Sequence, residues 1–235
     1  IAKKADVYFE FSVNEKLALE AVIGASFAGL KSLAAMKNFG LNVASDALMP
    51  FCYTGTKGPA VIVVADDPSC HSSAQSEKNS RPFGELAHIP ILEPSDPQEC
   101  LDFTKKAFLL SEKFKIPVMV RLTTRVAHQK MPVRFGLLPK KQPIPKEFVK
   151  DTKNFVTMPP RVLEMKKELF EKIEKIALLA EKDELNHIFS PGSNSKIGII
   201  TSGVSFLHVK EALAELGLEL PILKLGFFYP LPEKK

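Results

Sequence analysis

A glutamate lies at the start of a predicted helix, shortly after the end of a predicted strand. Residues 11–29 read FSVNEKLALEAVIGASFAG, and Glu15 falls in the first helical turn. A carboxylate can take or give a proton in catalysis. In a capping box, by contrast, the Ser12 side chain caps the helix while Glu15 reaches back to the Ser12 backbone N–H. The spacing alone favours the capping box, and the helix dipole also favours a first-turn glutamate.

Two further segments carry polar or glycine residues where chemistry is expected. Residues 36–42 read MKNFGLN, and Gly40 permits a close backbone approach, although it can equally be a turn glycine. Residues 66–81 (DDPSCHSSAQSEKNSR) follow a predicted strand, where open α/β sheets place ligands. The candidates in this loop are His71, Ser72, Ser73 and Arg81. An arginine suits a carboxylate, and a solvated polar loop explains the segment equally well.

The elements that must position these residues alternate between strand-like and helix-like patterns. Strands are predicted over 7–11, 33–36, 60–65, 89–92, 118–122, 196–201 and 220–225. Helices are predicted over 13–28, 40–53 with a break at Pro50, 96–114 capped by Ser95 or Asp96, 160–182 and 203–216. Residues 130–160 hold many prolines and lysines and are interpreted as a linker. This pattern predicts an α/β fold with a mostly parallel sheet and helices on both faces, followed by an incomplete second α/β domain.

Composition narrows the class of protein. The 235 residues are 45% hydrophobic and 25% charged, as in globular proteins. The three cysteines lie far apart, so no zinc or iron–sulfur motif is present and a reduced cytoplasmic protein is expected. The net charge of +5 comes with interleaved Lys and Glu and no nucleic-acid motif, so nucleic-acid binding is not predicted. Neither a membrane-length apolar run nor a signal peptide is visible, and no GxGxxG follows a strand.

Five segments in register resemble one enzyme family. They are SVNEKLALEAVIGASFAG (12–29), MKNFGLNVASDALM (36–49), VIVVADDPSCHSS (61–73), LEPSDPQE (92–99) and TTRVAH (123–128). Together they resemble the pyrimidine-binding domain of the large subunit of indolepyruvate:ferredoxin oxidoreductases, which use thiamine diphosphate. The end of the chain, with ITSGVSFLHVKEALAELGL and LKLGFFYPLPEK, resembles the start of the same subunit's transketolase-C-terminal-like domain. The resemblance therefore divides the chain into a pyrimidine-binding domain (1–130) that lacks its N-terminal strand, a linker with a charged helix (131–194) and the start of the next domain (195–235).

The resemblance implies roles for individual residues. Glu15 matches the glutamate that lies against N1′ of the thiamine aminopyrimidine; sharing a proton there favours the 4′-imino form, whose nitrogen removes the C2 proton. Met36, Phe39, Gly40 and Asn42 match the segment that borders the pyrimidine ring, although Met36 and Phe39 also suit a core. His71, Ser72, Ser73 and Arg81 match the substrate edge. The family has a glutamine directly after the two serines where this chain has Ala74, which puts the substrate preference in doubt.

The resemblance also implies what the whole enzyme does. It oxidatively decarboxylates arylpyruvates such as indole-3-pyruvate to acyl-CoA, with ferredoxin as electron acceptor, in an anaerobic cytoplasm. Its Mg²⁺ and diphosphate site and its [4Fe–4S] clusters lie outside these residues, and a smaller beta subunit is expected, so these residues alone are expected to be inactive. One alternative is a related enzyme for pyruvate, a branched-chain acid or 2-oxoglutarate. Another is a non-catalytic domain that serves subunit assembly.

Overall fold

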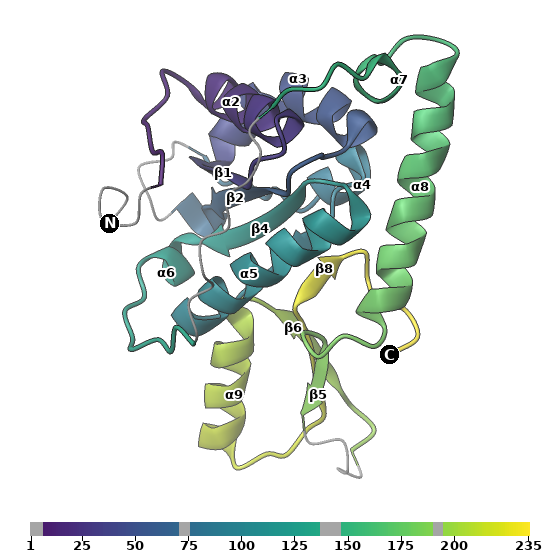
Figure 1. Ribbon diagram of the computed structural model, residues 1–235. Helices are drawn as coiled ribbons and strands as arrows, with labels where there is room; N and C mark the ends of the chain where they lie inside the picture. The colour runs from purple at the N-terminus through teal and green to yellow at the C-terminus, as the bar shows by residue number, and fades with distance from the viewer. Residues whose placement is uncertain (1–6, 71–75, 137–146, 190–194) are drawn as a thin grey trace.

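Two β-sheets organise the computed structural model, which describes residues 7–70, 76–136, 147–189 and 195–235 (Figure 1). The strands are β1 (Ser32–Lys37), β2 (Ala60–Asp66), β3 (Ile91–Leu92), β4 (Val118–Thr123), β5 (His187–Phe189), β6 (Ile199–Ser202), β7 (Ile222–Leu225) and β8 (Phe227–Tyr229). The helices are α2 (Glu15–Phe27), α3 (Asn38–Thr54), α4 (Phe83–Ala87), α5 (Pro97–Phe114), α6 (Thr124–Ala127), α7 (Thr152–Phe155), α8 (Arg161–Ala180) and α9 (Ser205–Leu216), with a 3₁₀ turn η1 (Pro68–Cys70).

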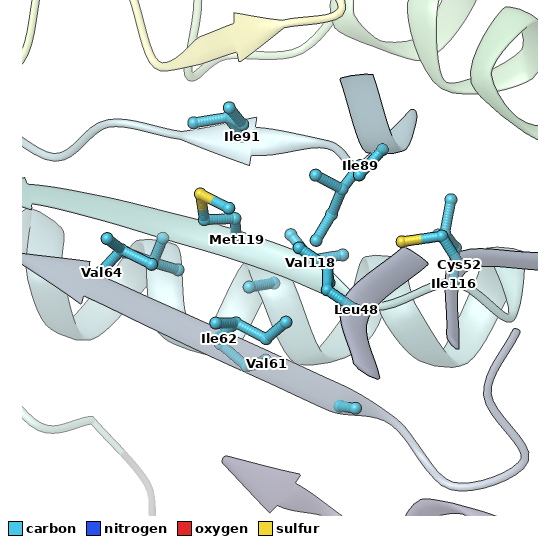
Figure 2. Close-up of a cluster of buried hydrophobic side chains, with 14 of the residues drawn as sticks. Leu48, Cys52, Val61, Ile62, Val64, Ile89, Ile91, Ile116, Val118 and Met119 are labelled. Carbon is cyan, nitrogen blue, oxygen red and sulfur yellow. The ribbon is translucent and has the colours of Figure 1, made fainter. Parts of the chain in front are cut away.

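The larger sheet has the order β1-β2-β4-β3-β8, and its pairs are parallel except for β3 with β8. Neighbouring residues of β2 are buried on both sides of the strand, as expected where helices cover both faces. Helices α2 and α3 pack against β1 and β2, while α5 packs against β2 and β4. Figure 2 shows the resulting core, in which Ile62, Val118 and Met119 meet side chains from α3 and β3. The predicted α/β class with a mostly parallel sheet is confirmed.

Several predicted boundaries are confirmed by local chemistry. Asp96 caps α5, because its side chain accepts a hydrogen bond of 2.9 Å from the Glu99 backbone N–H. Gly29 follows the end of α2 with a φ of +83°, a conformation that glycine adopts without steric cost.

Pro50, in contrast, does not break α3, so that expectation was wrong. The helix buries Leu48 and Phe51 on its inner side, and this packing outweighs one lost hydrogen bond.

Two expectations about the region before α2 were also wrong. Residues 7–11 form no strand: no described strand pairs with them, and Phe11 is 93% exposed. A strand needs a hydrogen-bonded neighbour, and apolar alternation cannot supply one. The predicted capping box is absent too. Asn14, not Ser12, caps α2 by accepting a hydrogen bond of 3.0 Å from the Leu17 backbone N–H. The Ser12 hydroxyl instead donates to the Glu10 carboxylate.

The second sheet is small and touches the first. Its order is β5-β7-β6, with β6 and β7 parallel and β5 antiparallel to β7. The sequence pattern had not indicated β5 or β8, and β8 returns to the larger sheet as the antiparallel neighbour of β3. The division of the chain at residues 130 and 194 stays a prediction. None of the helices in the described residues is long and apolar enough to cross a lipid bilayer.

Candidate functional site

The carboxyl ends of β1, β2 and β4 lie at one edge of the larger sheet, because these strands run parallel and in register. Helices α3 and α6 begin at that edge, directly after Lys37 and Thr123. The two segments that the sequence singled out, residues 36–42 and 66–81, also begin there. Parallel sheets place ligands outside this edge, so the side chains that gather here form the candidate site.

Glu15 and Gly40 meet at one end of this edge. The Asn14 cap holds Glu15 in the first turn of α2, and Gly40 lies in the first turn of α3. A Cβ atom on Gly40 would lie 2.8 Å from Cδ and 2.9 Å from Oε1 of Glu15, closer than real Cβ atoms come to other atoms. Only glycine therefore lets the Glu15 side chain rest on α3. The structure thus brings together two residues that the sequence had proposed separately.

The Glu15 side chain is half-buried, and its carboxylate has no partner within the part of the chain that the structure describes. Among the described residues, none donates a hydrogen bond to it or forms an ion pair with it. The neighbouring Lys16 pairs instead with Asp46 at 2.6 Å. A carboxylate placed this way keeps its proton-accepting capacity for a ligand.

The other predicted cofactor contacts have mixed surroundings. Met36 is buried in the core of the larger sheet, whereas Phe39 is 37% exposed. The Asn42 side chain is exposed and accepts a hydrogen bond from Nζ of Lys78. Nothing in the structure tests a contact of Met36, Phe39, Gly40 or Asn42 with a cofactor, so those roles stay predictions.

Lys78 is a residue that the sequence interpretation missed. It comes from the loop after β2, forms an isolated bridge with Asp67, and donates to the Asn38 backbone carbonyl at 2.8 Å. Burial is the largest influence on the Lys78 pKa and lowers it, while the Asp66 carboxylate opposes that change. The loop's sequence departs from the family pattern at this point, so no motif indicated that Lys78 would reach the start of α3.

Asn38, whose backbone carbonyl accepts this bond from Lys78, is fully buried. Its Oδ1 accepts a hydrogen bond of 2.8 Å from the Phe39 backbone N–H. Its Nδ2, however, has no hydrogen-bond partner among the described residues. A buried donor without a partner costs about 1–3 kcal/mol, so this corner of the sheet edge carries unused hydrogen-bonding capacity.

The middle of the edge holds a buried network of charges. Nη1 of Arg121 donates to Glu93 Oε1 at 2.9 Å, and Nε of Arg121 pairs with Asp66. Arg81 donates two hydrogen bonds to the same Glu93 carboxylate, from Nε at 2.7 Å and from Nη2 at 2.8 Å. The Ser202 hydroxyl donates to Glu93 Oε2 at 2.9 Å and so ties the second sheet to the first.

Electrostatics explains why these buried charges are tolerated. Burial by itself raises the pKa of Glu93, but the Arg81 hydrogen bonds and the charges of Arg121 and Arg81 outweigh it and hold that pKa below its ordinary value. The same bonds raise the pKa of Arg81. Two acids and two arginines therefore neutralise one another inside the protein.

The network changes how Arg81 is interpreted. Its guanidinium is already bound to Glu93 and Ser202, and it lies 4.2 Å from the ring centroid of Phe228. Its predicted place at the substrate edge stays a prediction. The other three residues predicted for that edge, His71, Ser72 and Ser73, lie outside the described residues.

A cavity of about 370 Å³ lies against the network. Its wall comes from the turn after β2, from the corner between β4 and α6, and from the first turn of α9. Arg125 lies in this wall, and its Nη1 is 3.5 Å from Nε2 of His208. Arg125 belongs to the TTRVAH segment of the family resemblance, and the structure puts it opposite a residue of α9. His128 of the same segment is exposed and does not line the cavity.

Comparisons with known proteins identify a family that the chain matches and proteins of similar sequence. Residues 2–174 match the family described as "Pyruvate flavodoxin/ferredoxin oxidoreductase, thiamine diP-bdg". The indolepyruvate oxidoreductase subunit IorA of Methanothermobacter thermautotrophicus is 47% identical over 99% of this chain and 37% of its own length. The protein of the same name from Archaeoglobus fulgidus is 42% identical over 98% of this chain and 37% of its own length. The chain thus spans little more than a third of these relatives.

A solved structure shows the same fold. It is the 2-oxoglutarate:ferredoxin oxidoreductase from Magnetococcus marinus, with 2-oxoglutarate, coenzyme A and succinyl-CoA bound. The TM-score is 0.72 at 19% sequence identity, and the match covers 98% of this chain and 47% of that one. At that identity the likeness supports the fold alone.

Proposed function

The chain belongs to the pyruvate flavodoxin/ferredoxin oxidoreductase family of thiamine-diphosphate-binding domains, and from this premise we propose that Glu15 activates thiamine diphosphate. The proposed enzyme oxidatively decarboxylates arylpyruvates such as indole-3-pyruvate. The observation that carries the proposal is the contact of Glu15 with Gly40. It places a carboxylate that no described residue bonds to at the sheet edge where parallel sheets bind ligands.

The residues at this corner fit a heteroaromatic ring with hydrogen-bonding nitrogens. Glu15 offers a carboxylate that can accept a proton, and Gly40 lets that side chain lie against the first turn of α3. Asn38 adds a buried donor that lacks a partner among the described residues. When bound, thiamine diphosphate supplies the carbon nucleophile for decarboxylation of a 2-oxoacid. Glu15 would orient the ring and hold the proton that it shares with a ring nitrogen.

The names of the relatives and the family resemblance support the proposed substrate and partners. Two proteins that match nearly the whole chain are named indolepyruvate oxidoreductase subunits, which favours an arylpyruvate substrate over the other 2-oxoacids. The proposed enzyme transfers the acyl group to coenzyme A and electrons to ferredoxin, through [4Fe–4S] clusters. We place these clusters, and the Mg²⁺ that holds the diphosphate, outside the present residues. A smaller beta subunit and an anaerobic cytoplasm complete the proposal.

A related activity on 2-oxoglutarate is the second candidate. A sequence match favours it: the 2-oxoglutarate synthase subunit KorA of Methanothermobacter marburgensis is 32% identical over 56% of this chain. Both candidates use Glu15 in the same way and differ in the substrate edge, where Arg81 is the predicted carboxylate contact. Steady-state assays with indole-3-pyruvate, 2-oxoglutarate and pyruvate separate them. A kcat/KM for indole-3-pyruvate at least tenfold above the others supports the first candidate.

The test of Glu15 is exchange of the thiamine C2 proton for deuterium, followed by NMR in the intact protein with its partner subunit. Glu15→Gln keeps the shape of the side chain and removes its charge. We expect exchange to slow by roughly 10²–10⁴-fold, the loss typical of an acid–base group. Glu20→Gln is the matched control, because Glu20 lies on the same helix and faces Lys16 at 4.0 Å. Equal exchange in wild type and Glu15→Gln contradicts the proposal. If the wild type exchanges no faster than free cofactor, the assembly domain becomes the better interpretation.

A further inference from the structure

Lys78 binds the start of α3 from outside the helix. Its Nζ donates a hydrogen bond of 2.8 Å to the Asn38 backbone carbonyl and a second hydrogen bond to Oδ1 of Asn42. Asn38 and Asn42 lie two residues before and two residues after Gly40 in the chain. The lysine therefore holds both sides of the residue on which the Glu15 side chain rests.

The segment that carries Lys78 is itself fixed to the end of β2. Lys78 forms an isolated antiparallel bridge with Asp67. Two residues further on, Ser80 donates to the Asp66 carboxylate, from its backbone N–H at 2.7 Å and from its hydroxyl at 2.6 Å. Asp66 is the last residue of β2 and is fully buried. A side chain that starts from this segment can therefore hold α3 in place relative to the larger sheet.

The start of α3 has no side-chain cap of its own. The residue before the helix, Lys37, makes no capping hydrogen bond, and the first turn contains no acid. Oδ1 of Asn38 accepts a hydrogen bond from the adjacent Phe39 N–H, which does not join the helix to another element. A helix start that lacks a cap is less stable, so its position depends more on the bonds from Lys78.

Stability alone does not explain a lysine at this place. The helix dipole makes the beginning of α3 positive, which disfavours a cation there. Burial also disfavours the charged form and lowers the Lys78 pKa, and the Asp66 charge only opposes that change. The benefit of Lys78 is therefore the position that it gives to α3.

The ammonium group of Lys78 has little capacity left for a ligand. A lysine offers three donors, and two of them bind Asn38 and Asn42. The ring centroid of Phe83 lies 5.5 Å from Nζ, within the range of a cation–π contact. Lys78 is thus placed to act through α3 and not on a bound cofactor.

We propose that Lys78 is a positioning residue for the activation of thiamine diphosphate: it holds the start of α3 so that Gly40 keeps the Glu15 carboxylate in place. This inference rests on the proposed role of Glu15 and adds to it a residue from the segment after β2. Without Lys78 the carboxylate stays at the corner but is less well placed, and a displacement of about 1 Å costs roughly 10²-fold in rate.

The test compares two lysines at opposite ends of α3. Lys78→Met keeps an unbranched side chain and removes its donors, and C2 exchange at saturating thiamine diphosphate is expected to slow about tenfold or more in the intact protein with its partner subunit. Lys172→Met is the matched control. Lys172 is also partly buried with a lowered pKa, donates at 2.9 Å to the Lys115 carbonyl, and lies beside Gly55 at the end of α3. Its replacement should leave C2 exchange within about twofold of the wild type.

Two further measurements separate positioning from a general loss of stability. Lys78→Arg keeps the charge and the donors, and it is expected to restore C2 exchange to within about threefold of the wild type. Hydrogen–deuterium exchange of the backbone amides gives a readout besides activity. Lys78→Met should speed this amide exchange in residues 38–42, and Lys172→Met should leave it unchanged there.

A double-mutant cycle tests whether Lys78 acts through Gly40. If it does, Gly40→Ala slows C2 exchange less in Lys78→Met than in the wild type. Additive effects would contradict the proposal. Equal C2 exchange in Lys78→Met and Lys172→Met overturns the role of Lys78 alone, provided that Glu15→Gln is slow. If Glu15→Gln exchanges as fast as the wild type, the proposed function fails and the role of Lys78 fails with it.

Discussion

In two regions of one sheet edge, the acidic side chains have opposite surroundings. At the Glu15 corner a half-buried carboxylate rests on a glycine, and no described residue bonds to it. In the middle of the same edge Asp66 and Glu93 are buried and bound by two arginines and two serines. All three acids belong to the same edge: Asp66 ends β2, Glu93 follows β3, and Glu15 contacts Gly40 in the helix that follows β1.

The difference in hydrogen bonding separates an acid that can react with a ligand from acids that stabilise the fold. An acid without a protein partner can exchange a proton with a ligand, whereas an acid held by several donors is fixed in its charged form. The charge network costs desolvation, and its bonds offset that cost only while every member is present. The network is therefore expected to govern stability, and the Glu15 corner is expected to govern activity.

The largest effect on stability is expected from replacing Arg121 in the charge network. Arg121→Met leaves Asp66 and Glu93 buried with too few partners, because Arg121 is 5% exposed and bonds to both. We expect the free energy of unfolding to fall by about 3–5 kcal/mol, measured by urea denaturation of the intact protein. The exposed Arg134→Met should change it by less than about 0.5 kcal/mol. A loss below about 1 kcal/mol would mean that the network is not a stabilising unit.

Gly40→Ala tests whether the Glu15 corner governs activity and not stability. The added Cβ would push Glu15 away, while the backbone of Gly40 accepts alanine because its φ is not positive. Displacement of a reacting group by about 1 Å costs roughly 10²-fold in rate, so C2 exchange should slow by about that factor. The free energy of unfolding should change by no more than about 1 kcal/mol, since alanine favours helices.

Gly24→Ala is the control for this substitution. Gly24 lies on α2, and nothing is within 4 Å of a Cβ built there. Its replacement should leave C2 exchange unchanged and increase stability slightly. If Gly40→Ala and Gly24→Ala behave alike, Glu15 does not need the space beside α3.

The sequence alone predicts the local elements of this protein better than the contacts between them. Local signals placed the elements well: the apolar run of β2 and the Asp96 cap of α5 depend on neighbours in the chain. Glu15 came from a family resemblance, and the spacing alone favoured a capping box that does not exist. Nothing local indicated that Lys78 would reach Asn38, or that Arg121 would meet both Asp66 and Glu93. Those contacts join residues 28 to 55 positions apart, and only the fold brings them together.

The pH dependence of unfolding tests the charge network without removing an arginine. Glu93 has a lowered pKa in the folded protein, so below its ordinary value of 4.5 the unfolded chain binds more protons than the folded one. Its contribution to stability is present above that pH and is lost as pH falls through the folded pKa. Glu93→Gln should therefore flatten the fall of unfolding free energy between about pH 5 and pH 3.

The control for this experiment is Glu211→Gln, on the exposed side of α9. Both variants and the wild type are unfolded with urea at several pH values, and the slopes are compared. Identical slopes for the wild type and Glu93→Gln would show that the arginines do not hold the Glu93 carboxylate charged. A steeper slope for Glu93→Gln would show that the sign of the shift is wrong.

The smallest effect distinguishes Asn14, the cap of α2 in the structure, from Ser12, the cap that the sequence predicted. Asn14→Ala removes the acceptor of the Leu17 N–H and should cost about 1 kcal/mol of unfolding free energy. Ser12→Ala should cost almost nothing, because the Ser12 hydroxyl bonds to the exposed Glu10 and not to the helix. Since the cap also positions the first turn, Asn14→Ala should slow C2 exchange modestly while Ser12→Ala leaves it unchanged. The reverse ranking would restore the capping box and make Glu15 a structural residue, which is the outcome that removes the distinction between the two regions.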